Sequence, residues 1–400
     1  MKKFIVRSER VYTPDGVIDG GIIISGRIIE KIIEKEDLSR YKELEFINAE
    51  NNLIIPGLID IHIHGSGGWT VSSEDERQIK GMCKYLPSIG VTSFQPTLGG
   101  EDVESIKKYL NTIGSVIKGY YEGAKILGIH MEGPFLNPEK KGVFLVRNLL
   151  KPSVELMKSF IEKSGNNIIH VTVAPELDGA EELIKYLTCN GILVAGGHTN
   201  GTIEETKKGI QWGISLSNHT CNAQRSIHHR EPGALGGYLL DDNVYCELIC
   251  DFIHVHPDML KLILKIKSPE KICMISDSIV ASGLRPGKYD FSGREIIIDE
   301  ESSRLSDGTI AGSTKNLLYG FKNMAYLGYS IEDVIKMSSS LPAKLSNVYD
   351  EKGSIEEGKD ADFVILDDNF NVHMTYVEGK VCFDSSERKS FLNQQDISRI

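Results

Sequence analysis

The sequence predicts an α/β fold: a (β/α)8 TIM barrel joined to a small β-sandwich domain that is built from both ends of the chain. Two observations lead to this prediction. Apolar runs alternate eight times with longer polar stretches between residues 53 and 277, and strand-like segments flank this region on both sides. A chain of 400 residues can hold a barrel of roughly 250 residues together with such additions.

The two ends of the chain are expected to form one domain, made of residues 1–52 and 353–386. The first part, containing FIVRSERVYTPDGVIDGGIIISGRIIEKIIE, is rich in β-branched residues and has PDG and SG turns. The second part returns to short strands around EEGKDAD. Each end is too short to hold a core alone, so we expect them to pair. Residues 387–400 are polar and predict a surface tail or terminal helix.

Residues 53–352 are expected to form the barrel. The intervening segments, such as SVELMKSFIEKSG and IEETKKGIQWG, carry apolar residues at helical spacing, which predicts a helix after each strand. The eight expected strands are residues 53–64, 91–98, 125–133, 168–176, 191–198, 214–220, 244–255 and 271–277.

Composition indicates an ordinary globular protein, with 40% hydrophobic and 25% charged residues. The net charge of −11 opposes general binding to nucleic acid or to an anionic membrane. The N-terminal MKKFIVRSER lacks a signal-peptide core, and no apolar stretch has the length of a membrane span. Seven scattered cysteines without C-x-x-C pairs suit a reducing compartment, so we expect a cytoplasmic protein.

Polar residues follow the expected strands at the ends that form the mouth of a barrel. His62 and His64 are two apart on a strand, so their side chains point to the same face. Any one of these residues, taken alone, could equally be a structural residue in the core or on the surface. Their joint placement at the C-terminal ends of different strands instead indicates an active site. The others are Glu132 after the third strand, His198 after the fifth, His219 after the sixth, His254 after the seventh and Asp277 after the eighth.

This set of imidazoles and carboxylates predicts a metal site. Imidazole nitrogens and carboxylate oxygens suit zinc, divalent iron and manganese. A site with three or four such ligands keeps a position open for water, as hydrolytic metal sites do. His130, His170 and His256 receive a structural interpretation, and Gly67 and Gly68 form a turn and not a phosphate-binding loop, because no G-K-[ST] follows.

Several segments carry a more specific pattern: PGLIDIHIHG, HMEGPFLNPEKKG, GGHTNG, SNHTCNAQRSIHHREPG, DFIHVHP, SDS, IAGST and GSIEEGKDADFVILD. In these segments, over nearly its whole length, the chain resembles the N-acetylglucosamine-6-phosphate deacetylases of the amidohydrolase superfamily. The H-x-H strand and G-x-x-G-K-x-A-D-x-V occur widely in the superfamily. H-M-E-G-P-F, G-H-T-N and H-H-R-E-P-G are specific to the deacetylases.

The resemblance implies hydrolysis of N-acetylglucosamine 6-phosphate to glucosamine 6-phosphate and acetate. It implies that Glu132, His198 and His219 bind a divalent metal, that His62 and His64 are available for a second ion, and that Asp277 is the acid/base. Zinc or iron is expected first, and manganese is the further option. An ion held this way activates water and polarises the amide carbonyl.

The resemblance also assigns substrate contacts. The phosphate is expected at Asn222, the backbone of Ala223, Arg230 and His254, where the guanidinium fork suits bidentate binding. A homodimer is implied, in which the neighbouring subunit helps close the phosphate pocket. The sugar-lining residues implied are Gly142, Val143, Asp251, Phe252, Ile253, His254, Ile310, Ala311 and Gly312.

The chain departs from the family at one notable position. Some members have a histidine after K-K-G-x that polarises the substrate carbonyl, whereas this chain has Phe144. A second ion at His62 and His64 could do the same work. A milder change is SDS around Asp277, where many members have T-D-A or T-D-G.

Three alternatives stay open at this level. The galactosamine epimer of the substrate needs the same metal, acid/base and phosphate contacts. A cyclic-amide hydrolase, such as a dihydroorotase or hydantoinase, typically uses a carboxylated lysine at the end of the fourth strand, where this chain reads VTVAPE. A non-catalytic scaffold is disfavoured because all matching ligands and Asp277 are present.

Overall fold

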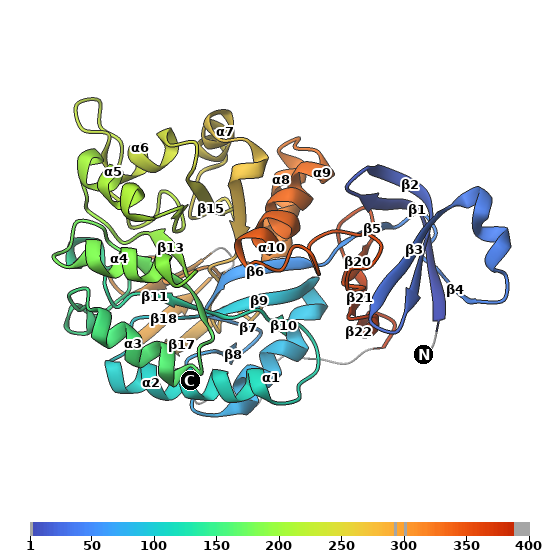
Figure 1. Cartoon of the computed structure of the whole chain (residues 1–400), viewed down its shortest axis with the longest axis horizontal. Helices are drawn as coiled ribbons and strands as arrows, with labels where there is room; N and C mark the ends of the chain where they lie inside the picture. Colours follow the sequence, from blue (N-terminus) through green and yellow to red (C-terminus); the bar gives the residue numbers. More distant parts are fainter. Residues whose placement is uncertain (1–2, 292–293, 300–301, 388–400) are drawn as a thin grey trace.

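The computed structural model describes residues 3–291, 294–299 and 302–387. It shows a barrel wrapped in helices, with a small β domain at one side in which the blue N-terminal and red C-terminal strands lie together (Figure 1). Residues 388–400 of the expected tail lie outside the described residues. Among the described residues, no helix has both the length and the apolar character needed to cross a membrane.

The predicted TIM barrel is confirmed. Neighbouring strands run parallel around it, and β10 (Lys125–Ile126) adds a short pairing with β9. The first and eighth positions meet where the Asp277 N–H donates to the His62 carbonyl at 3.0 Å and Ile63 bridges Ser278. The barrel strands are β6 (Leu58–Ile63), β9 (Val91–Leu98), β11 (Ile129–Glu132), β12 (Ile168–Val173), β13 (Leu193–Gly196), β14 (Leu216–Ser217), β15 (Tyr245–Ile249) and β16 (Ile272–Ile275).

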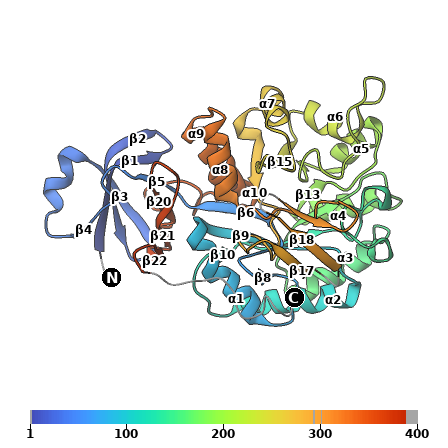
Figure 2. The ribbon, with the colours of Figure 1, turned by 180° about the vertical axis from the view of Figure 1, so that it is seen from behind.

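Helices cover the outside of the barrel, as both ribbon views show (Figures 1 and 2). Local signals set where they begin: the Thr202 hydroxyl accepts the Glu205 N–H at the start of α5, and the Glu205 carboxylate accepts the Thr202 N–H in a capping box. The helices are α1 (Glu76–Tyr85), α2 (Val103–Lys118), α3 (Val154–Lys163), α4 (Ala180–Cys189), α5 (Ile203–Trp212), α6 (Gly233–Leu240), α7 (Pro257–Ile266), α8 (Leu317–Tyr326), α9 (Ile331–Ile335) and α10 (Leu341–Leu345).

The small domain joins both chain ends in one bent sheet around its own core. β5 pairs with β1 on one side and with β20 on the other, so it links the N-terminal and C-terminal strands. The rings of Phe363 and Tyr376 stack at 4.4 Å within this core, against Phe4. The strands are β1 (Lys3–Thr13), β2 (Gly16–Ser25), β3 (Ile28–Glu34), β4 (Glu45–Asn48), β5 (Leu53–Pro56), β20 (Phe363–Leu366), β21 (Val372–Val377) and β22 (Lys380–Asp384).

Two features differ from the sequence-based expectation. The strand expected over 53–64 is divided at Gly57 into β5 of the small domain and β6 of the barrel. A side chain at Gly57 would overlap Thr92, so the close crossing requires glycine. We still propose a small domain from both chain ends and a separate barrel domain. Residues 53–56 now belong to the small domain, because β5 pairs with its strands. The second difference is an unexpected sheet after β16, made of β17 (Gly287–Phe291), β18 (Arg294–Ile298) and β19 (Ser303–Leu305).

Candidate active site

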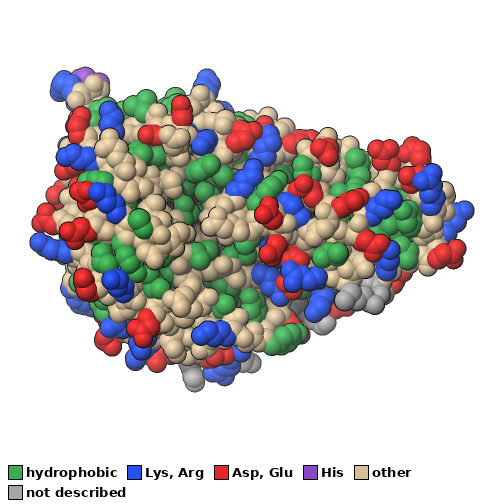
Figure 3. Space-filling model, viewed as in Figure 1, with side chains coloured by type: hydrophobic (Ala, Val, Ile, Leu, Met, Phe, Trp, Pro, Cys, Tyr) green, Lys and Arg blue, Asp and Glu red, His purple; other side chains and the backbone are tan. Residues whose placement is uncertain are grey.

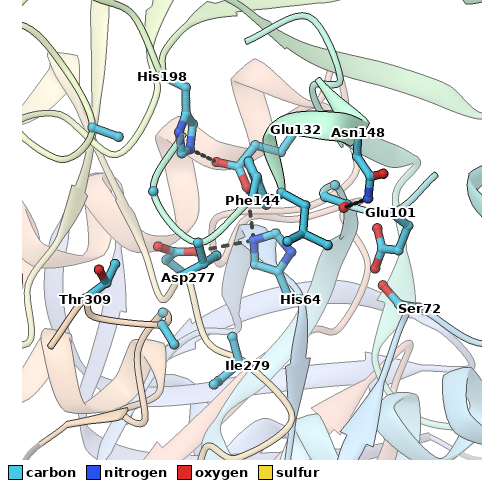
Figure 4. Close-up of a pocket in the computed structure, with 18 of the residues that line it drawn as sticks. His64, Ser72, Glu101, Glu132, Phe144, Asn148, His198, Asp277, Ile279 and Thr309 are labelled. Carbon is cyan, nitrogen blue, oxygen red and sulfur yellow. Dashed lines mark hydrogen bonds and ion pairs between the residues drawn. The ribbon is translucent and has the colours of Figure 1, made fainter. Parts of the chain in front are cut away.

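Five of the expected residues converge on one point at the mouth of the barrel, around the carboxylate of Glu132. Its Oε1 lies 2.9 Å from His219 Nε2, 3.1 Å from His198 Nε2 and 3.6 Å from His62 Nε2. Its Oε2 lies 3.3 Å from His64 Nε2. Figure 4 shows His198 and His64 approaching Glu132 from different sides. The four imidazoles form two groups around this carboxylate, His198 with His219 and His62 with His64, and both groups share Glu132.

The outer ring nitrogen of three histidines is held by an acceptor. His198 Nδ1 lies 2.7 Å from the Lys140 carbonyl, and His219 Nδ1 lies 3.1 Å from the Asn222 carbonyl. A ring nitrogen facing a carbonyl must carry the proton, which leaves Nε2 of both rings as a free lone pair. In their neutral form, these two histidines could each offer Nε2 to a metal ion.

His62 is held in the same way by a carboxylate. Its Nδ1 lies 3.1 Å from Oε2 of Glu247, a fully buried residue of β15. The same oxygen accepts the backbone N–H of His219 at 3.0 Å. The Nε2 atom of His62 is buried and has no hydrogen-bond partner among the described residues. Glu247 therefore positions one residue from each imidazole group.

Backbone strain marks the same strand ends. His198, His219 and Asp277 have φ values of 45°, 21° and 49°, in the left-handed region that residues with side chains seldom adopt. Such conformations cost energy and persist where the surrounding structure enforces them, typically at functional sites. All three of these side chains line the pocket at the mouth.

Asp277 lies beside the imidazole groups. Its Oδ1 is 3.3 Å from His64 Nε2 and 3.5 Å from His62 Nε2. Burial alone would raise the pKa of Asp277, but the hydrogen bond with His64 and the nearby imidazole charges outweigh it and lower the pKa to about 2. The carboxyl group is thus an ionised base within the site.

The charge balance of the site suits a cation. Burial alone would lower the pKa of His64, but hydrogen bonds to Asp277 and Glu132 raise it to about 9. In the part of the chain that the structure describes, every ion pair of Glu132 and Asp277 is with a histidine. Two buried carboxylates without Lys or Arg partners favour positive charge, and divalent ions supply it where imidazole lone pairs are free. The residues present therefore fit a divalent metal.

The site opens into a pocket of about 780 Å³. This volume lies in the usual range for small-molecule sites, roughly 300–1,000 Å³. Its wall includes Leu305 and Thr309, from β19 and the loop that follows it, so the unexpected sheet helps to enclose the site. The expected substrate residues that line it are Gly142, Val143, Asn222, Ala223, His254, Ile310, Ala311 and Gly312.

The other expected substrate residues lie elsewhere. Asp251 is buried behind His254, with its Oδ2 at 2.7 Å from His254 Nδ1 and its Oδ1 accepting the N–H of Ile253. Phe252 packs against the main core. Arg230 is exposed and lies outside the lining of its own pocket. Its segment, residues 226–230, is exposed throughout and corresponds to the projecting tip with His and Lys/Arg side chains at the upper left of Figure 3.

Phe144 and the remaining histidines have clear positions. The Phe144 ring lies 5.0 Å from the His198 ring and lines the pocket, where it can make only apolar contacts. His130 and His170 stack at 3.7 Å inside the barrel, and burial lowers the pKa of His170 to about 4. His256 caps α7 by accepting the N–H of Asp258. These three histidines are structural.

Sequence reasoning missed two acidic residues at the site. Glu247 could have been suspected, because it is a charged residue within the apolar strand YCELI. Glu101, which lines the pocket after β9, gives no comparable signal, since loop carboxylates are common.

Comparisons with known proteins identify the family. The Amidohydrolase family model matches residues 53–382. The N-acetylglucosamine-6-phosphate deacetylase of Bacillus subtilis is 34% identical over 96% of this chain and 98% of its own. The crystal structure of the deacetylase of that name from Thermotoga maritima has a TM-score of 0.86 at 32% identity, covering 96% of this chain and 100% of its own. That from Pasteurella multocida has a TM-score of 0.89 at 28% identity, covering 95% and 99%.

Proposed function

The chain belongs to the amidohydrolase family and, within it, to the N-acetylglucosamine-6-phosphate deacetylases, and we propose how its residues carry out that deacetylation. The reaction hydrolyses N-acetylglucosamine 6-phosphate to glucosamine 6-phosphate and acetate. The observation that carries the proposal is the convergence of four imidazoles on Glu132, with Asp277 beside them, at the base of one pocket that His64, His198 and His219 line. The relatives compared above are all named for the glucosamine substrate, which favours it over the galactosamine epimer.

Two groups of residues would hold divalent ions. Glu132, His198 and His219 form one candidate set, and His62, His64 and Glu132 form the other, each with ligand atoms within 4.8 Å of one another. Glu132 belongs to both sets and would contribute to each. A bound divalent ion, zinc or iron foremost, supplies a water of lowered pKa and polarises the amide carbonyl. The second set would take over the carbonyl contact that Phe144 cannot make.

Asp277 would be the acid/base. Its carboxylate is ionised and faces the centre of the site, so it can take a proton from water as the water attacks the acetyl carbon. The same group would then deliver the proton to the amide nitrogen, because the amine cannot leave as an anion.

The 6-phosphate would lie at the loops after β14 and β15. Asn222, Ala223 and His254 line the pocket there. Arg230 cannot serve its own pocket in the described arrangement, because it is exposed outside the pocket lining. We therefore propose a homodimer in which Arg230 of one subunit reaches the phosphate in the other.

The direct test is acetate release by metal-replete protein from N-acetylglucosamine 6-phosphate, its galactosamine epimer and unphosphorylated N-acetylglucosamine. We expect the phosphorylated glucosamine substrate to have the highest kcat/KM. Faster turnover of the epimer would identify N-acetylgalactosamine 6-phosphate as the preferred substrate, with the proposed mechanism unchanged. Absence of acetate from all three would overturn the assignment of the site.

Dimeric catalysis has its own test. Arg230→Ala and Asp277→Asn subunits are prepared separately and mixed after dissociation. If Arg230 acts across the interface, the mixed dimer has one site with both residues intact, and activity returns toward a quarter of wild type for statistical mixing. Activity no greater than the sum of the two variants would contradict the proposal.

A further inference from the structure

The carboxylate of Glu176 joins three loops at the mouth of the barrel. Glu176 follows β12, the fourth barrel strand, and lies outside the lining of the pocket. β12 pairs with β11 on one side and with β13 on the other. Glu132 ends β11, and His198 follows shortly after the end of β13. The side chain of Glu176 therefore starts between the loops that follow two candidate metal ligands, although the proposed reaction gives it no role.

Glu176 accepts hydrogen bonds from both neighbouring loops. Its Oε1 atom accepts the side-chain amide of Asn137 at 2.8 Å and the backbone N–H of Asn200 at 2.7 Å. Its Oε2 atom accepts the hydroxyl of Thr199 at 2.5 Å. Hydrogen bonds to a carboxylate are stronger than those between neutral groups. Both oxygens of Glu176 thus hold the loop after β11 and the loop after β13 in one arrangement.

The loop after β11 contacts His198 at two points. The N–H of Asn137 donates to the His198 carbonyl at 2.9 Å, and the Lys140 carbonyl lies 2.7 Å from His198 Nδ1. Asn137 also caps the short turn Pro138–Lys140 with its side-chain oxygen, while its side-chain amide is directed to Glu176. A displacement of Asn137 would therefore alter the contacts of both the backbone and the ring of His198.

Glu176 supports the backbone of His198 from the other side through Thr199. Thr199 follows His198 in the chain and is fully buried. His198 has a φ value of 45°, a strained conformation that persists only where the surrounding structure enforces it. The N–H of Thr199 donates to the Ala223 carbonyl at 3.1 Å, so its backbone is held as well as its side chain. The hydrogen bond from Thr199 to Glu176 therefore helps to fix the residue directly after the strained position.

All three of these hydrogen-bond donors to Glu176 are close to His198. Asn137 donates to the carbonyl of His198, and Thr199 and Asn200 are the next two residues of the chain. Groups that fix the ring orientation of a metal-binding histidine also affect metal affinity. The hydrogen bonds of Glu176 therefore act on one candidate ligand, in addition to joining the loops.

We propose that Glu176 is a positioning residue for His198. It fixes Asn137 and Thr199, and these two residues fix the backbone and the ring of His198. In this arrangement His198 Nε2 lies 3.1 Å from Glu132 Oε1 (Figure 4). The inference rests on the proposed function, in which His198 belongs to a set of residues that holds a divalent ion. Removing the carboxylate of Glu176 should therefore weaken metal binding, although no ligand is lost.

Zinc affinity tests the positioning role. Chelated wild type and variants are titrated with zinc in competition with a coloured chelator, and we expect the zinc Kd of Glu176→Ala to rise by about 10–100-fold. Glu176→Gln keeps an acceptor oxygen for Asn137 and Asn200, and its amide can donate to the Thr199 hydroxyl, so it should retain most of the wild-type affinity. A residue with only a structural role would lower the unfolding temperature of the chelated protein and leave the zinc Kd unchanged.

A double-mutant cycle tests the path through Asn137. Asn137→Ala removes the amide that donates to Glu176, so it should also weaken zinc binding. The double variant Glu176→Ala, Asn137→Ala should lose less than the product of the two single losses, because both changes break the same contact. Losses that multiply would contradict the path. If Glu176→Ala does not fold, Asn137→Ala decides, and an unchanged zinc Kd in that variant overturns the proposal.

The control is Glu182→Ala, the same exchange at an exposed position in the first turn of α4, the helix that follows Glu176. Its zinc Kd should equal that of wild type. An unchanged zinc Kd in Glu176→Ala, or equal losses in Glu176→Ala and Glu176→Gln, would overturn the positioning role. If wild type hydrolyses N-acetylglucosamine 6-phosphate in that case, the proposed function stands alone. If wild type binds zinc but releases no acetate, the proposed function fails, and the zinc affinities still decide the role of Glu176.

Discussion

Two buried clusters of charge differ in how that charge is balanced. In the small-domain cluster, Lys352 Nζ donates to Asp360 at 2.6 Å and to Asp362 at 2.8 Å, and Arg27 Nε donates to Asp360 at 2.7 Å. In the mouth cluster, Glu132 and Asp277 face only imidazoles in their described ion pairs. The first cluster contains its own cations, and the second does not.

The difference separates a structural site from a functional one. A buried carboxylate that is fully paired holds chain segments together: Asp360 pairs with Lys352 of its own segment and with Arg27 from the N-terminal part of the chain. A buried carboxylate set surrounded by free imidazole lone pairs is incomplete without a cation. The following changes should therefore affect stability in one cluster and chemistry in the other.

The largest effect is expected for Asp277→Asn. The amide cannot take the proton from water, so kcat should fall by about 10²–10⁴-fold. Metal content measured by elemental analysis should stay at the wild-type level if Asp277 is an acid/base and not an essential ligand. Loss of metal together with activity would instead indicate that Asp277 is a metal ligand.

Lys352→Ala should act on folding alone. Removing the ammonium leaves Asp362 buried without its cation and leaves Asp360 paired with Arg27 alone, and we expect a loss of about 3–5 kcal/mol in the free energy of unfolding. Denaturant titration measures the loss, with the exposed Lys265→Ala on α7 as the control, expected within about 0.5 kcal/mol. A large change in metal affinity in the folded variant would contradict the separation of the clusters.

Removing the divalent metal should lower the free energy of unfolding, because the carboxylates and imidazoles at the barrel mouth then lack their cation. Chelated protein should unfold at a lower temperature, and adding zinc or iron at 100 times its Kd should restore about 2.7 kcal/mol. Glu132→Gln should lose most of this metal-dependent gain, because both candidate sets include Glu132. An equal gain in the variant would place the ion elsewhere.

The smallest effect is expected for Glu247→Ala. This carboxylate orients His62 and accepts the N–H of His219, so its loss should weaken metal binding by about 10–100-fold. Glu247→Gln retains an acceptor oxygen, so its metal affinity should fall by a smaller factor. Tyr245→Phe, on the same strand, should bind metal as wild type does. Unchanged affinity in Glu247→Ala would show that its contact with His62 is only structural.

Much of the candidate site followed from local sequence signals. His62 and His64 could be assigned to one face because a strand has a period of two, and Asp277 to the mouth because it ends a strand of the β/α alternation. Glu101 and Arg230 could not be placed this way. A loop residue can point into the pocket or into solvent, and only the path of its loop decides which.

The sequence by itself therefore determined the barrel, the pairing of the two chain ends, and the group of histidines and carboxylates, because these depend on periodicity and on where each strand ends. Only the tertiary structure decided that residues 53–56 join the small domain, that Glu247 holds His62, that Arg230 lies outside the lining of its own pocket, and that Glu101 Oε2 has no partner among the described residues. Each of these depends on distances between segments far apart in the chain, such as the 3.1 Å contact between His62 and Glu247, and no local pattern records such distances.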